Sequence, residues 1–158
     1  MIIYFLRHAE AEVRAASDFE RKLTAKGKDQ SRSVGKFCCE HELIPDLILT
    51  SPVCRARETA VLVNQEFSDQ RELIEVPWAA CGMSPESAFK ELRTYDAFNS
   101  LMLVGHEPDL STLIATTLGL DNSQALSISK ASLTIIQFKK IMPGHGILEG
   151  LLPCSFTH

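Results

Sequence analysis

Short apolar runs recur along the chain, separated by longer segments of mixed polarity. Each run spans four to seven residues and is rich in branched aliphatic or aromatic side chains, which is typical of buried β-strands. The runs predict strands at residues 2–6, 47–50, 73–76, 101–104, 132–138 and 147–152.

Helix signals follow each of the first four runs. Thr24 and Ser84 stand where N-caps belong, and Pro52 takes an allowed position at a helix start. Helices are predicted at about residues 24–42, 52–67, 84–95 and 109–118. In the first helix, apolar spacings of three and four predict a buried face made of Val34, Phe37, Cys38 and His41.

Strands that alternate with helices are typical of parallel sheets, and the last two strands follow each other across Pro143-Gly144-His145-Gly146. We therefore expect a single α/β domain over residues 1–158, a three-layer α/β/α sandwich. Its sheet would be mostly parallel, with an antiparallel hairpin at one edge.

Composition excludes several classes of protein. A net charge of −4 without a basic stretch argues against nucleic-acid binding. The first apolar run is too short for a signal peptide, and no run has the length of a membrane helix. The five cysteines form no Cys-x-x-Cys pair, so neither zinc nor a disulfide framework is expected. We expect a cytoplasmic protein without membrane association.

Basic side chains stand just after three predicted strands. Arg7 and His8 follow the first strand, Arg55 follows the second by one helical turn, and His106 follows the fourth. In open α/β sheets, ligands bind beyond the carboxyl ends of the strands. Taken alone, each of these residues is more often a surface group, and that interpretation is kept for Arg57.

Convergence of the four groups would be unfavourable without an anion. Arginine offers a planar fork of donors that matches phosphate oxygens. A neutral histidine can attack phosphorus, and imidazole with an ordinary pKa of about 6.5 is mostly neutral at pH 7. The pattern therefore predicts a phosphoryl-transfer site.

Four segments carry motifs in order: Arg7-His8-Ala9, Leu23-Thr24-Ala25-Lys26-Gly27-Lys28-Asp29-Gln30, Ser51-Pro52-Val53-Cys54-Arg55-Ala56-Arg57-Glu58-Thr59-Ala60 and Val104-Gly105-His106-Glu107-Pro108-Asp109-Leu110-Ser111. They resemble the signatures of the histidine phosphatase superfamily, which has the phosphoglycerate mutase-like fold. The last motif is similar to the second-histidine motif of its SixA branch, the small phosphohistidine phosphatases. The final forty or so residues carry no motif.

The resemblance implies roles for the matched residues. His8 would be the nucleophile that becomes phosphorylated, Arg7 and Arg55 would bind phosphoryl oxygens, and His106 would stabilise charge in the transition state. Such a site needs no metal and no cofactor. Arg21, in the loop before the first helix, is a further candidate for contact with phosphate or with a substrate protein.

The sequence departs from the family pattern twice. Ala9 replaces a signature glycine, which requires a negative φ at that residue. The mutase-like relatives also carry a glutamate general acid after the third strand, whereas residues 77–83 contain no carboxylate. Asp18 and Glu107 are possible substitutes, although each is equally well explained as a partner of Arg21 or of a helix N-terminus.

A missing acid favours phosphohistidine, because imidazole leaves with less protonation than an alkoxide. We expect a phosphatase acting on a histidine-phosphorylated signalling or phosphotransfer protein, such as a histidine phosphotransfer domain, and releasing inorganic phosphate. One alternative is a phosphatase for small phosphomonoesters. Another is a phosphate-binding module without catalysis.

Overall fold

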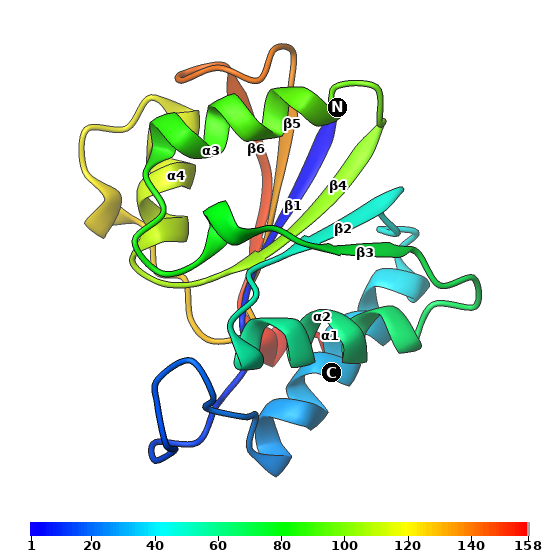
Figure 1. Cartoon of the computed structure of the whole chain (residues 1–158). Coiled ribbons are helices and arrows are strands. Elements are labelled where there is room, and N and C mark those ends of the chain that lie inside the picture. The colour runs from blue at the N-terminus through cyan, green and yellow to red at the C-terminus, as the bar shows by residue number, and fades with distance from the viewer. Residues whose placement is uncertain (158) are drawn as a thin grey trace.

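A computed structural model describes residues 1–157, and a single six-stranded sheet lies at its centre (Figure 1). The strand order is β3-β2-β4-β1-β5-β6. The strands are β1 (Ile2–Arg7), β2 (Leu47–Thr50), β3 (Glu72–Glu75), β4 (Ser100–Gly105), β5 (Leu133–Phe138) and β6 (Gly146–Leu152). The first four are mutually parallel, and β5 and β6 form an antiparallel pair at one edge. This confirms the expected sheet.

Helices cover both faces of the sheet, as Figure 1 shows. The helices are α1 (Ala25–Glu40), α2 (Cys54–Gln65), α3 (Pro85–Leu92) and α4 (Asp109–Leu118). Helices α1 and α2 lie together on one face, and α3 and α4 lie on the other. The expected three-layer α/β/α sandwich is confirmed.

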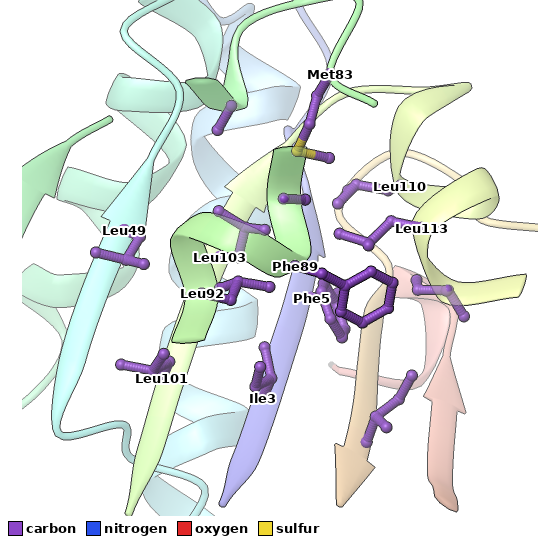
Figure 2. Packing of buried hydrophobic residues seen from close by; sticks show 14 of the residues in the cluster. Ile3, Phe5, Leu49, Met83, Phe89, Leu92, Leu101, Leu103, Leu110 and Leu113 are labelled. Atoms are coloured by element: carbon purple, nitrogen blue, oxygen red, sulfur yellow. The ribbon is translucent and has the colours of Figure 1, made fainter. Parts of the chain in front are cut away.

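The period of two along the strands divides the core into two clusters. In β1, Ile3 and Phe5 face α3 and α4, whereas Tyr4 and Leu6 face α1 and α2. Figure 2 shows the first cluster, in which Phe89 of α3 packs beside strand and α4 side chains. Because both faces of the central strands are covered, their sequences read as continuous apolar runs.

The predicted buried face of α1 was partly wrong. Phe37 is only half-buried, and His41 is exposed beyond the helix end, where its ring contacts that of Phe37 at a tilt of 42°, with centroids 4.2 Å apart. The residues that pack inward are Gly27, Ser31, Val34, Gly35 and Cys38. Small residues form this face because α1 lies close to α2: a Cβ at Gly35 would stand 2.7 Å from the Val63 carbonyl oxygen. Apolar spacing alone does not reveal so close an approach.

Other boundaries shift by one to three residues. Helix α2 begins at Cys54, two residues after Pro52, and β3 ends at Glu75. The predicted loop at 77–83 opens with a short 3-10 helix, Pro77–Ala79. No helix within residues 1–157 is long and apolar enough to cross a membrane. We expect His158 to be exposed and without a role, and this residue lies outside the described part of the chain.

Candidate active site

The carboxyl ends of β2, β4 and β1 lie side by side in the sheet. Arg7 pairs with Gly105 across the two strands, and the His8 amide continues the ladder by donating to the Gly105 carbonyl at 3.0 Å. On the other side, the Ser51 amide donates to the Val104 carbonyl at 3.0 Å. This register brings the ends of three strands that are distant in sequence to one place.

His8 is held as a neutral imidazole with one defined tautomer. Its Nδ1 lies 2.7 Å from the Ala9 carbonyl oxygen and therefore carries the proton. Its Nε2 accepts a hydrogen bond from Arg55 Nε at 3.2 Å, which requires a lone pair there. Burial, reinforced by the nearby His106 and two arginines, lowers the pKa of His8 to about 3. The imidazole is thus unprotonated at Nε2 over the whole neutral pH range.

The backbone after His8 is fixed by the neighbouring helix. Ala9 does not adopt a positive φ, which meets the condition for alanine in place of glycine. Its amide donates to Thr59 Oγ1 at 3.1 Å, and the Thr59 hydroxyl donates to the Arg55 carbonyl at 2.7 Å. Thr59 therefore ties the His8 segment to the turn of α2 that carries Arg55.

Arg55 is buried, and its guanidinium donates to several acceptors. Besides His8, Nη1 donates to the Asp18 carbonyl oxygen at 2.8 Å, and Nη2 approaches Asp18 Oδ2 at 3.1 Å and Cys81 Sγ at 3.5 Å. A cation in the first turn of a helix opposes the helix dipole. Here the Asp18 carboxylate supplies the anion that balances it.

Arg7 is half-buried and has no such contact with a carboxylate of residues 1–157. Its Nη1 donates to the Ile128 carbonyl at 2.7 Å, while its buried Nε has no hydrogen-bond partner among these residues. Burial lowers the pKa of Arg7, although nearby Glu107 opposes this shift. A buried donor without an acceptor is unfavourable, and a bound anion would remove that cost.

His106 completes the group. Its ring centroid lies 5.2 Å from that of His8, and its Nε2 shares a 2.8 Å hydrogen bond with Ser51 Oγ. Its Nδ1 is buried and has no hydrogen-bond partner in the described part of the chain. Burial and the nearby Arg55 lower the pKa of His106 to about 4. The structure therefore brings Arg7, His8, Arg55 and His106 together at one edge of the sheet.

The other candidates occupy different positions. Arg21 hydrogen-bonds the Glu12 carbonyl oxygen and pairs with Asp18 at 2.9 Å, so it reaches Arg55 only through that carboxylate. The pKa of Asp18 is lowered by its hydrogen bond to Arg21 and further by Arg55. Glu107 accepts from the Ser111 amide at 3.0 Å and thus caps the start of α4.

Sequence reasoning assigned no role to three groups that shape the site. Ser51 and Thr59 lie inside the motif around Arg55, and membership of that motif was the signal that could have identified them. The Ile128 carbonyl comes from the part of the chain without motifs. A backbone acceptor in a loop leaves no trace in side-chain identity, so no pattern could have identified it.

A family profile described as histidine phosphatase superfamily (branch 1) matches residues 3–98 of the chain. The chain belongs to the histidine phosphatase superfamily. The matched region ends before His106. The pairing of β1 with β4 brings His106 beside Arg7, His8 and Arg55.

Two relatives of this superfamily member carry informative names. A phosphohistidine phosphatase SixA homolog of Haemophilus influenzae (strain ATCC 51907 / DSM 11121 / KW20 / Rd) is 33% identical over 133 residues, 77% of this chain and 80% of the relative. Phosphohistidine phosphatase SixA of Escherichia coli (strain K12) is 28% identical over 117 residues, 73% of each chain.

Solved structures agree with the fold. The histidine phosphatase SixA complexed with tungstate has a TM-score of 0.90 at 19% identity, with 100% of each chain covered. An Escherichia coli protein described as an α-ribazole-5′-phosphate phosphatase has a TM-score of 0.76 at 19% identity, with 98% of each chain covered. At such identities, these likenesses establish the shared fold alone.

The segment after β3 lies next to the candidate site. The Asp109 carboxylate accepts from the amides of Gly82 and Met83 at 2.7 and 3.2 Å, which fixes this segment against the start of α4. Cys81, next in the chain, directs its sulfur at Arg55. An uncharged thiol therefore stands beside the guanidinium, and burial raises its pKa.

The site thus combines one unprotonated imidazole nitrogen, two guanidinium groups and a second neutral imidazole. Within residues 1–157, no three His, Cys, Asp or Glu side chains are grouped as metal ligands would be. The arrangement can bind a tetrahedral oxyanion and present a nitrogen nucleophile to its centre.

Proposed function

We propose that this protein is a phosphatase that removes the phosphoryl group from phosphohistidine in a protein, with His8 as the nucleophile. Residues 1–158 would form one histidine phosphatase domain. The observation that carries the proposal is the state of His8: the Ala9 carbonyl holds the proton on Nδ1, and Nε2 is left unprotonated, its lone pair accepting from Arg55 Nε at 3.2 Å until a phosphoryl oxygen takes that donor.

In the first step, His8 Nε2 attacks phosphorus of the bound phosphohistidine. A P–N bond forms to His8, and the P–N bond to the substrate breaks with its electron pair moving to the substrate imidazole. Arg55 and Arg7 donate to the equatorial phosphoryl oxygens, where charge is concentrated in the transition state. His106 lies beside them and binds the same oxygens through Nδ1, which no residue from 1 to 157 engages in a hydrogen bond.

The substrate follows from which proton donors the site lacks. Asp18 is held as a carboxylate by Arg21 and Arg55, and Glu107 is engaged with the helix. An alkoxide leaving group would need a carboxylic acid that neither residue supplies in these positions. A phosphohistidine protonated on its other ring nitrogen leaves as a neutral imidazole, and it needs no such donor.

In the second step, water attacks the phosphorus of phospho-His8. The P–Nε2 bond breaks, its electron pair returns to His8, and inorganic phosphate leaves. The names of the Haemophilus influenzae and Escherichia coli relatives support this assignment. We further propose that the partner is a histidine phosphotransfer domain or a similar protein in the cytoplasm, and that the reaction needs no metal.

The test is phosphate release from a histidine-phosphorylated phosphotransfer domain, with a generic phosphomonoester measured in parallel. Wild type should release phosphate from the phosphoprotein, with or without a chelator. His8→Ala should lose at least about a thousandfold in rate, since the covalent route is removed. His145→Ala is the matched control, because this exposed histidine lies in the β5–β6 connection.

Equal rates for wild type and His8→Ala would overturn the mechanism. Turnover of the phosphomonoester alone, still dependent on His8, would assign small molecules as the substrate. Tight phosphate binding without turnover of either compound would instead support a binding module.

A further inference from the structure

The segment between β1 and α1 exposes apolar side chains beside the proposed site. We define residues 12–22 as the docking loop. Val13 in this loop is 87% exposed and Phe19 is 52% exposed. Figure 1 shows the segment, in blue, projecting from the body of the molecule at the carboxyl end of β1. Both apolar side chains are thus left open to contact with another molecule beside the proposed site.

The docking loop has a defined conformation. An antiparallel bridge joins Ala11 to Leu23 at its base, and the Glu12 amide donates to the Lys22 carbonyl at 2.8 Å. Arg21 ties the Glu12 carbonyl to the Asp18 carboxylate across the loop. Val13 and Phe19 are therefore exposed in a loop whose conformation is held by hydrogen bonds.

The same loop contacts the phosphate-binding arginine. Asp18 accepts from both Nη atoms of Arg55. The Phe19 carbonyl accepts from the Cys54 amide at 3.1 Å, one residue before Arg55. The docking loop therefore borders Arg55, where a phosphohistidine presented to His8 would be bound.

A hollow in the loop gives the partner a chemical description. It has a volume of about 590 Å³ and is lined by residues 13–18 and Arg21. The charge of Arg21 is balanced by Asp18 at 2.9 Å. Arg14 forms neither a hydrogen bond nor an ion pair with any described residue of the chain. The hollow thus offers apolar contact at Val13 together with one uncompensated positive charge.

We propose that the docking loop binds the histidine-phosphorylated protein substrate, through an apolar side chain and a carboxylate that flank the phosphohistidine. Phe19 and Val13 contact the apolar group, and Arg14 pairs with the carboxylate. The inference rests on the proposed function and adds the surface that distinguishes a protein substrate from a small phosphoramidate.

The experiment compares two substrates, a histidine-phosphorylated phosphotransfer domain and free N-phosphohistidine. Phe19→Ala and Val13→Ala should each raise KM for the phosphoprotein about tenfold, as expected for apolar interface anchors. Both variants should hydrolyse free phosphohistidine at the wild-type rate.

Arg14→Glu should slow the phosphoprotein reaction at low salt, with the deficit shrinking as salt is added. Met142→Ala is the control, since it removes a 42%-exposed apolar side chain at the other edge of the sheet.

Each outcome decides a different point. A selective loss on the phosphoprotein supports the docking loop. Unchanged rates on both substrates overturn the proposal that the docking loop binds the substrate protein, and they leave the proposed function intact. An equal loss on both substrates also overturns it, because the loop would then act on the chemistry through Arg55. If wild type hydrolyses neither phosphohistidine substrate, the proposed function fails and the docking inference fails with it.

Discussion

We call the carboxyl ends of the parallel strands the carboxyl edge of the sheet, and their amino ends the amino edge. The cations at these two edges lie in opposite environments. At the carboxyl edge, the Arg55 side chain is 6% exposed and its donors are directed at His8 and Asp18. At the amino edge, Arg93, Lys139 and Lys140 are exposed around a hollow of about 530 Å³. A buried cation has lost most of its hydration and depends on nearby acceptors. The exposed cations keep most of their hydration, and Arg93 adds one protein contact, from its Nε to the Ile141 carbonyl at 2.9 Å.

This difference teaches where chemistry is to be sought in such a fold. The hollow at the amino edge is roomy, yet none of the superfamily motif residues lines it. The candidate active site at the carboxyl edge instead combines buried imidazoles with a buried guanidinium, and burial there moves two histidine pKa values far from their ordinary range. Converging desolvated groups identify the site better than open volume does.

The sharpest test of the comparison removes one arginine from each edge. Arg55→Ala should lower kcat/KM for phosphohistidine hydrolysis by about a thousandfold, because it deletes a preorganised donor to the transition-state oxygens. Arg93→Ala should keep nearly the wild-type value. Arg55→Lys tests geometry, since it retains the charge but loses the planar fork.

Steady-state kinetics on all three variants measures this effect, with circular dichroism to verify folding. Comparable losses for Arg55→Ala and Arg93→Ala would remove the distinction between the two edges.

A second test uses pH, since buried histidines couple folding to protonation. The pKa values of His8 and His106 are about 3 and about 4 in the fold, below the ordinary value of 6.5. As pH falls below 6.5, the unfolded chain takes up protons that the folded chain refuses. The free energy of unfolding should therefore decrease, by up to about 1.4 kcal/mol per pH unit for each histidine, until the folded pKa is reached.

Urea unfolding at pH 7, 6 and 5 measures this slope. The double variant His8→Gln, His106→Gln should show a flatter dependence than wild type over the same interval. Identical slopes would mean that the site histidines do not account for acid sensitivity.

The smallest expected effect concerns the carboxylate that balances Arg55. Asp18→Asn should lower the inhibition constant for inorganic phosphate several-fold, because the product no longer competes with a negative charge 3.1 Å from Arg55 Nη2. The effect is modest because the Asp18 side chain is 62% exposed and its charge is screened by water. Product-inhibition kinetics gives the constant directly, and weaker phosphate inhibition in the variant would show that Asp18 assists anion binding.

Much of the fold was predictable because its signals are local. Apolar runs identified all six strands, and caps such as Thr24 and Ser84 located helix starts that the structure confirms. The inward face of α1 was not predictable, since Gly27 and Gly35 lie there for close contact rather than for apolar area. A Cβ at Gly27 would collide with the Glu10 carbonyl, and spacing rules do not register that constraint.

For the site, the sequence indicated which residues stand after strand ends, and motif resemblance selected four of them. It left Asp18 undecided between proton donor and partner of Arg21. The structure shows Asp18 bound to both Arg21 and Arg55, with a lowered pKa. The catalytic roles of Arg7, His8, Arg55 and His106 stay predictions until the variants above are measured.

By itself, the sequence determined the succession of strands and helices and the positions of Arg7, His8 and His106 at the ends of strands, because hydrophobic period and residue order act over short distances. Only the tertiary structure decided that β4 lies between β2 and β1, so that His106 meets His8 and Ser51. It alone also directed the Ile128 carbonyl toward Arg7. These contacts join segments far apart in the chain, and they depend on which strands pair and in what register, which side-chain identity does not encode locally.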